Sequence, residues 1–177
     1  MASEEVPSLD LQSDVAAGEP VISESPATGD VPRDQTPRTL QVDIVAPDQH
    51  VFQGMVSRLR APGKQGGFEI RYNHAPMIAA LEVGPLVLTL PGAQQLTFAT
   101  SGGFVEVIGN VVTVLAETAE PASAIDVNRA QAAEARALER LRSAKDDIDR
   151  ARAERARERA RNRLRVGMAS IGGRAES

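Results

Sequence analysis

The sequence predicts an α+β protein: an antiparallel β-sandwich of about ten short strands, followed by an antiparallel two-helix hairpin. Residues 39–118 alternate apolar and polar side chains in short runs that glycine and proline interrupt, which is typical of a sandwich. Residues 126–166 change to a helical period and are rich in alanine and arginine. Residues 1–38 hold eight acidic and two basic side chains and only isolated apolar ones, so we expect a disordered acidic extension there.

The predicted sandwich consists of runs with period-two hydrophobicity, enough to bury the core of an independent domain. We interpret Gly84-Pro85 and Gly102-Gly103 as turns between strands, and Gly109-Asn110 as a hairpin turn of type II′. The expected strands are Thr39–Ala46, Val51–Gln53, Val56–Ala61, Phe68–Arg71, Met77–Leu81, Leu86–Leu90, Gln95–Thr100, Phe104–Ile108 and Val111–Ala116.

The predicted hairpin lies between a linker, residues 119–125, and a flexible tail, residues 167–177. Asp126 can cap a first helix and Asp146 a second, with the bend at Ser143–Lys145. Ten alanines lie between residues 130 and 160, among few larger aliphatic side chains. Alanine favours the helix but buries little apolar surface, so the hairpin is expected to stay helical and to open easily.

Composition excludes several classes of protein. The chain has no cysteine, which rules out disulfides, thiol nucleophiles and cysteine metal sites, and two histidines are too few for a histidine-based metal site. It has no phosphate-binding loop and no recognisable catalytic set, and we interpret His74 as a structural loop residue. We therefore expect no enzyme and no metal. No apolar run is long enough to span a membrane, and no secretory signal is visible.

The second predicted helix carries a stripe of cations. Arg152, Arg155, Arg159 and Arg163 are three or four residues apart and share one face. Arg159 and Arg163 could bind successive phosphates, because guanidinium groups form paired hydrogen bonds with them. On spacing alone, a solvated face with the interspersed Glu154 and Glu158 is the favoured interpretation. Duplex DNA binding is disfavoured, because residues 129–165 mix seven acidic with 13 basic side chains.

Residues 39–166 resemble the epsilon subunit of bacterial F-type ATP synthase. The matching stretches stand in the same order and at nearly the same spacing as in that family. They are Val42–Pro47, Asn73–Pro76, Ser101–Val107, Val112–Glu120, Ile125-Asp126 with Arg129-Ala130, and Asn162–Leu164. The resemblance covers about three quarters of the chain and leaves the acidic extension outside.

The resemblance implies a non-catalytic rotor subunit at the cytoplasmic face of the bacterial inner membrane, peripheral and not spanning it. The sandwich would contact the gamma subunit and the c-ring. The hairpin would either fold against the sandwich or extend toward the alpha and beta subunits, where it inhibits ATP hydrolysis. No cofactor is required, and no nucleic acid is expected as a partner.

The resemblance also implies a site for ATP as a regulatory ligand in the folded hairpin. The residues at the positions of that family's site are Glu120, Ile125, Asp126, Arg129, Ala130, Arg159 and Arg163. Two departures concern the stretch Gly66–Glu69, where the acidic residue is displaced, and Pro121, which follows Glu120. The alternative from the residues alone is a β-sandwich adaptor whose basic helical arm binds an acidic partner or nucleic acid.

Overall fold

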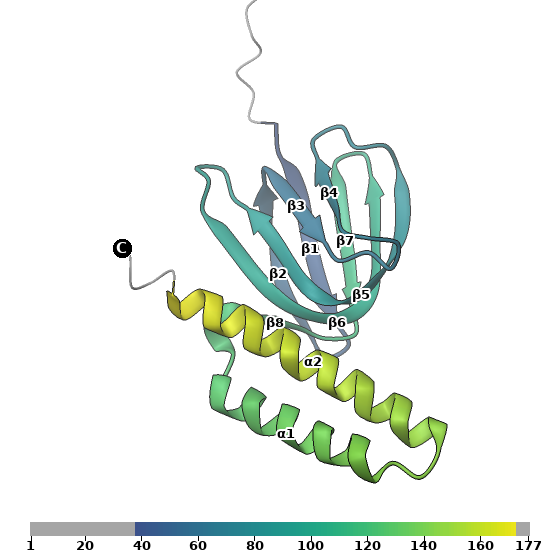
Figure 1. Cartoon of the computed structure of the whole chain (residues 1–177). Helices are drawn as coiled ribbons and strands as arrows, with labels where there is room; N and C mark the ends of the chain where they lie inside the picture. The colour runs from purple at the N-terminus through teal and green to yellow at the C-terminus, as the bar shows by residue number, and fades with distance from the viewer. Residues whose placement is uncertain (1–37, 173–177) are drawn as a thin grey trace, which may run out of the picture. The chain divides into compact units, whose positions relative to one another are not determined.

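The computed structural model describes residues 38–172 of the 177-residue chain. Nearly all of the predicted acidic extension, and the end of the predicted tail, therefore lie outside the described residues. Within them, a curved β-sheet is followed by two helices (Figure 1). No helix in this part of the chain is long and apolar enough to cross a membrane.

Residues 38–172 form eight strands in a mixed sheet. The strands are β1 (Leu40–Ala46), β2 (Gln49–Val56), β3 (Arg58–Ala61), β4 (Phe68–Arg71), β5 (Met77–Thr89), β6 (Gln95–Ile108), β7 (Val111–Ala116) and β8 (Ala119–Pro121). Their order is β2-β1-β7-β6-β5-β3-β4, and β8 pairs with β6. Only β1 and β7 are parallel among these pairs; the other neighbours are antiparallel.

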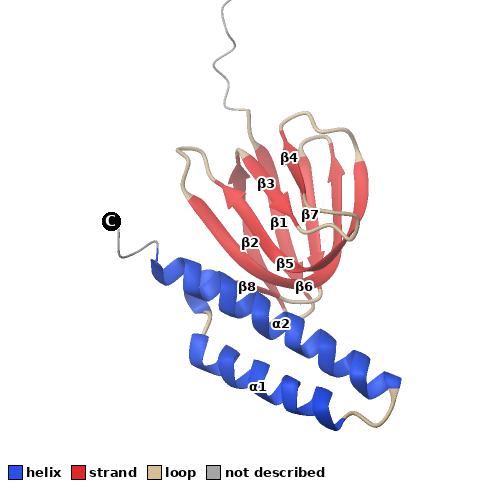
Figure 2. Cartoon of the chain, viewed as in Figure 1, coloured by secondary structure: helices blue, strands red, loops and turns tan. Residues whose placement is uncertain are grey.

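The sheet forms the predicted sandwich because its two longest strands, β5 and β6, curve (Figure 2). The curvature folds one continuous sheet around a single core of aliphatic side chains. Its largest fully buried members are Leu40, Ile44, Leu59, Ile70, Leu81, Leu86 and Leu88. Burying each such side chain contributes about 1.5–3 kcal/mol, so this core is the main source of stability in the described part.

The sandwich has eight strands rather than about ten: two expected turns lie inside strands, which removes two strands, and β8 in the expected linker adds one. Gly84-Pro85 lies within β5, and Gly102-Gly103 lies within β6. A Cβ on Gly84 would approach Pro62 Cβ to 2.5 Å, so this glycine permits close packing of a loop and does not end the strand. Gly102 and Gly103 have φ of +118° and +126°, which a glycine adopts without strain.

The hairpin follows the short strand β8 and a 3-10 turn, η1 (Ala122–Ala124), so the segment expected as a linker has structure of its own. The helices are α1 (Val127–Ser143) and α2 (Asp147–Gly172). Both predicted caps are confirmed: Arg129 N donates to Asp126 Oδ1 at 3.0 Å, and Asp149 N donates to Asp146 Oδ1 at 2.7 Å. α2 continues beyond residue 166, the expected end of the hairpin.

Replacing Gly103 by alanine should destabilise the sandwich much more than replacing Gly92. Both glycines have positive φ, but a Cβ at Gly103 would lie 2.1 Å from Leu115 O, whereas nothing lies within 4 Å of one at Gly92. We expect Gly103→Ala to lower the free energy of unfolding by about 3 kcal/mol, and Gly92→Ala by about 1 kcal/mol from its backbone conformation alone. Urea denaturation measures both; equal losses would contradict the close approach of β6 to β7.

Candidate functional site

A cavity of about 350 Å³ lies where β8, the start of α1 and α2 meet. It is lined by Glu120, Ala124, Asp126, Arg129, Ala130, Ala133, Arg136 and Arg163. Five of the seven residues predicted for the nucleotide site are among them. The other two, Ile125 and Arg159, do not line this cavity.

The start of α1 supplies one wall of the cavity. Asp126 caps the helix with its side chain, and its carbonyl accepts from Ala130 N at 3.0 Å, which fixes the first turn. Arg129 and Arg136 are seven residues apart, two helical turns, and therefore project from the same face. Ala130 and Ala133 lie on this wall, and their small side chains leave room for a ligand.

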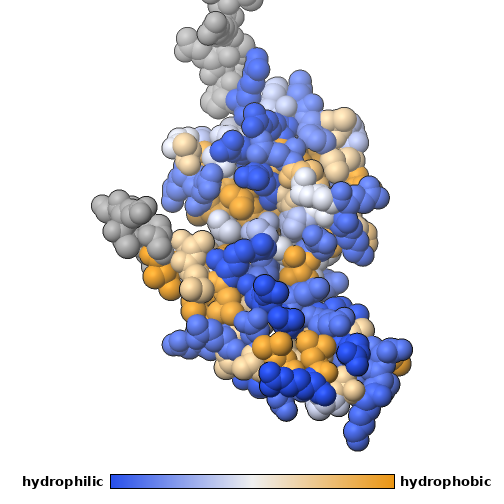
Figure 3. All heavy atoms as spheres, in the orientation of Figure 1, coloured by the Kyte–Doolittle hydropathy of each residue, from blue (hydrophilic) through white to orange (hydrophobic). Residues whose placement is uncertain are grey.

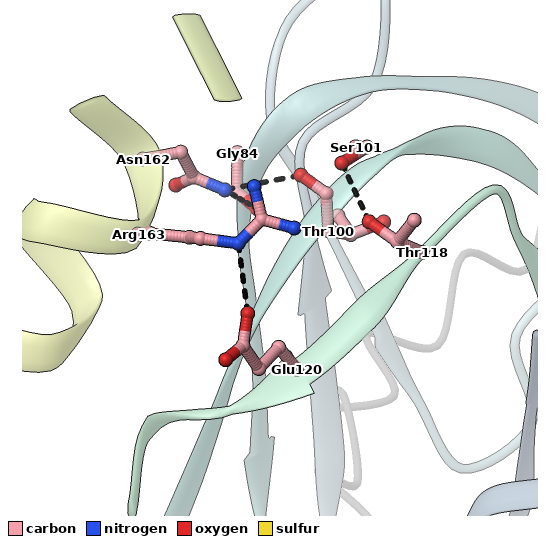
Figure 4. Close-up of polar contacts among 7 residues, drawn as sticks. All are labelled: Gly84, Thr100, Ser101, Thr118, Glu120, Asn162 and Arg163. Atoms are coloured by element: carbon pink, nitrogen blue, oxygen red, sulfur yellow. Dashed lines mark hydrogen bonds and ion pairs between the residues drawn. The ribbon is translucent and has the colours of Figure 1, made fainter. Parts of the chain in front are cut away.

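Arg163 of α2 closes the other side through an ion pair with Glu120 of β8. Its Nε donates to Glu120 Oε2 at 2.8 Å, and each side chain is about a third exposed (Figure 4). Arg129 and Arg136 form no ion pair with any of the described residues. The cavity lining therefore holds three arginines against two carboxylates, Glu120 and Asp126, and Arg129 and Arg136 are exposed and outside any ion pair among the described residues. This excess of positive charge favours a polyanionic ligand.

Sequence reasoning missed Arg136, although its spacing from Arg129 on a predicted helix was a sufficient signal. Arg159 lies one turn before Arg163 on α2 and is partly buried, outside the lining of the cavity. Ile125 packs against Gly167 of α2 instead. The two residues are so close that a Cβ added to Gly167 would lie 2.9 Å from Ile125 Cγ2 and 3.1 Å from Val127 Cγ2. Gly167 thus permits α2 to lie close against the start of α1.

The α1–α2 seam is built from small side chains, as the alanine content predicts. The buried apolar residues of the described hairpin are Ala130, Ala137, Ala153, Ala160 and Val166. Glu134 adds an ionic contact across the seam, with its Oε1 at 3.9 Å from Arg157 Nε and 3.8 Å from Arg161 Nε. In the view of Figure 3, hydrophilic side chains lie over much of the hairpin, with apolar atoms between them.

A second cavity, about 660 Å³, lies between the β3–β4 region, β5 and α2, and its charges are balanced. Its lining includes Arg60, Glu69, Glu82 and Arg165. Arg71 donates a hydrogen bond to Glu69, which lowers the pKa of the Glu69 carboxyl; nearby arginine charges lower this pKa further, and burial opposes the shift.

No group of three or more histidine, aspartate or glutamate side chains that could hold a metal occurs in residues 38–172. The basic cavity at the hairpin is therefore the better candidate site.

The structure therefore defines a class of binding subunit: a β-sandwich followed by a C-terminal helical hairpin, with a basic cavity where the two meet. Two family models cover both parts: the "ATP synthase, Delta/Epsilon chain, beta-sandwich domain" matches residues 39–122, and the "ATP synthase, Delta/Epsilon chain, long alpha-helix domain" matches residues 123–167. The chain belongs to this ATP synthase delta/epsilon family, among the epsilon subunits of bacterial F-type enzymes.

Curated relatives agree with this assignment, and a solved structure shares the fold. The ATP synthase epsilon chain of Salinibacter ruber is 54% identical over 143 residues, covering 76% of this chain and 96% of the relative. That of Nitratidesulfovibrio vulgaris is 43% identical over 129 residues, covering 73% and 96%. A chain in the Euglena gracilis mitochondrial ATP synthase shares the fold, with a TM-score of 0.62 and 21% identity over 81% of this chain and 85% of that one.

Asp126 should contribute to the site by holding the first turn of α1, not only by its charge. Asp126→Ala removes the acceptor for Arg129 N and should destabilise this turn by about 1 kcal/mol, whereas Asp126→Asn keeps an acceptor and should preserve it. Amide hydrogen exchange at Arg129 and Ala130 reports the difference. If the asparagine variant exchanges as fast as the alanine variant, the carboxylate charge, and not the cap, holds the turn.

Proposed function

We propose that this chain is a non-catalytic subunit of the central stalk of an F-type ATP synthase, where its sandwich connects the gamma shaft to the c-ring. The observation that carries this proposal is the family match to both parts of the chain, residues 39–122 and 123–167, in the order and spacing that the fold also shows. As part of that complex, it would act at the cytoplasmic face of the bacterial inner membrane. The absence of a catalytic set from its sequence agrees with a structural and regulatory role.

An exposed apolar face of the sandwich is a suitable surface for the gamma subunit. Phe104 and Leu115 are paired across β6 and β7 and are 56% and 55% exposed. Ile108 and Val111 are paired farther along the same two strands and are also exposed. Side chains at alternate strand positions share a face, so these four lie on the side opposite the buried Val105, Val107, Val112 and Val114. An apolar face of this kind in a soluble domain marks a protein interface.

The hairpin is the proposed regulatory element, with ATP as its ligand. In the folded state, Glu120, Asp126, Arg129, Ala130 and Arg163 come together around one cavity, where a triphosphate could displace Glu120 from Arg163. The extended state, directed at the alpha and beta subunits, would separate Arg163 from the other four. ATP would then bind only the folded state and favour it by about 2.7 kcal/mol at 100 times its dissociation constant.

Removing one aromatic and one aliphatic side chain from the apolar face should weaken assembly with the gamma subunit. Phe104→Ser combined with Leu115→Ser should lower the affinity for the isolated gamma subunit by about tenfold or more, because both side chains would be buried in the complex. The control is Ile148→Ser combined with Met168→Ser, which changes two exposed apolar residues of α2. Surface plasmon resonance measures both; equal losses in the two variants would move the interface away from this face.

Neutralising Arg159 and Arg163, for which the family resemblance implies contacts with the phosphates, should weaken ATP binding. We expect Arg159→Ala combined with Arg163→Ala to raise the dissociation constant by about tenfold or more, measured by isothermal titration calorimetry on the full chain. The matched control, Arg152→Ala combined with Arg155→Ala, removes the same charge from exposed positions of the same stripe. Equal losses together with steep salt dependence would instead support the polyanion-binding adaptor.

A further inference from the structure

Asn162 is a buried polar residue at the centre of the contact between α2 and the sandwich. It is 5% exposed, and Nδ2 donates to Gly84 O at 2.9 Å and to Thr100 O at 3.0 Å. Its Oδ1 accepts from Arg165 Nη2 at 3.2 Å. The amide therefore has partners for both its donor and its acceptor groups, all within the described residues.

The two carbonyls that accept from Asn162 belong to paired strands. Gly84 of β5 and Thr100 of β6 face each other in the β5–β6 register, so a single amide group bridges both strands. Thr100 also pairs with Ala119 of β8, and Ala99 beside it pairs with Glu120. Consecutive residues of α2 thus contact consecutive positions of the β6–β8 ladder: Asn162 at Thr100, and Arg163 at Glu120 (Figure 4).

The buried apolar side chains of the hairpin specify its position only weakly, because they are small. The buried alanines recur at a spacing of seven residues on each helix, as Ala130 and Ala137 on α1 and Ala153 and Ala160 on α2. A small, repeating apolar surface fits almost as well after a shift of two turns. The hydrogen bonds of a buried amide are directional and would be lost after such a shift. A single buried asparagine fixes the register of packed helices in coiled coils for the same reason.

We propose that Asn162 is a positioning residue that holds α2 on β5 and β6 in one register and thereby places Arg163 in the basic cavity. This inference rests on the proposed opening of the hairpin and on the proposed nucleotide site. Without the Asn162 donors, the closed state would leave Gly84 O and Thr100 O without their α2 partner, whereas the open state would expose them to water. Loss of the donors therefore penalises only the closed state.

The absence of cysteine from the chain allows a direct test of the closed fraction. Nitroxide labels on Gln95→Cys, at the start of β6, and Lys145→Cys, at the bend between the helices, sit on exposed residues. Double electron–electron resonance then gives the distribution of distances between the two labels in the full chain.

The variants to compare are Asn162→Asp and Asn162→Leu, which differ in charge and polarity but share the loss of both N–H donors. Asn110→Asp, in the β6–β7 turn, is the control; it makes the same change and keeps the acceptor for Asn73 N.

We expect both Asn162 variants to raise the ratio of open to closed hairpin by about tenfold, and the control to match the parent. Amide hydrogen exchange of β6 and β7 should be unchanged in all of them, which shows that the sandwich remains folded. Opening in Asn162→Asp alone would assign the effect to charge and overturn the proposal. No opening in either variant would overturn it as well.

Titration with ATP separates this inference from the function on which it rests. Saturating ATP should restore the closed distance in Asn162→Leu, and the apparent dissociation constant should rise in inverse proportion to the closed fraction before ATP is added. A change in affinity larger than the closed fraction allows would mean that Asn162 touches the nucleotide, which contradicts a positioning role. If the parent binds no ATP, the nucleotide site fails, while the distance distributions still decide the role of Asn162.

Discussion

The hairpin and the sandwich are held in their observed arrangement by a short polar contact between α2 and the ladder of β5, β6 and β8. Asn162 hydrogen-bonds two strands at once, and its neighbour Arg163 pairs with Glu120 of a third. Glu120 lies on the three-residue strand β8, which is itself held by Thr100 and its neighbours on β6. The walls of the cavity come from β8, the start of α1 and α2, so this contact also joins the elements that form the cavity.

The two parts of the described chain differ in the size of the side chains that they bury. The sandwich encloses leucine, isoleucine and valine, whereas the hairpin buries alanines and one valine. Since stabilisation rises with the apolar area removed from water, we expect the sandwich to be the more rigid part and the hairpin to be the part that opens at the lower cost. This difference in buried apolar area suits the proposed function, in which the sandwich stays attached while the hairpin changes position.

Sequence patterns predicted the parts of the structure that depend on local physical chemistry. The alternation in residues 39–118, the caps Asp126 and Asp146, and the small buried residues of the hairpin all appear as expected. Continuity of β5 through Gly84-Pro85 was not predictable, because the reason for that glycine is a contact with Pro62. The parallel pairing of β1 with β7 and the bonds from Asn162 to carbonyls 78 and 62 residues away depend on the assembled fold, which no local pattern encodes.

Gly167 lies where α2 packs most closely against the start of α1, and only a hydrogen atom fits there as its side chain. Its missing side chain is what lets the last third of α2 settle against Ile125 and Val127, where the chain leaves the sandwich and α1 begins. A methyl group there would clash with Ile125 and Val127 and push the two helices apart, and a branched side chain would do so more strongly. If the hairpin opens as proposed, a larger residue at position 167 would therefore shift it toward the open state, without changing the residues that line the cavity or the sandwich core.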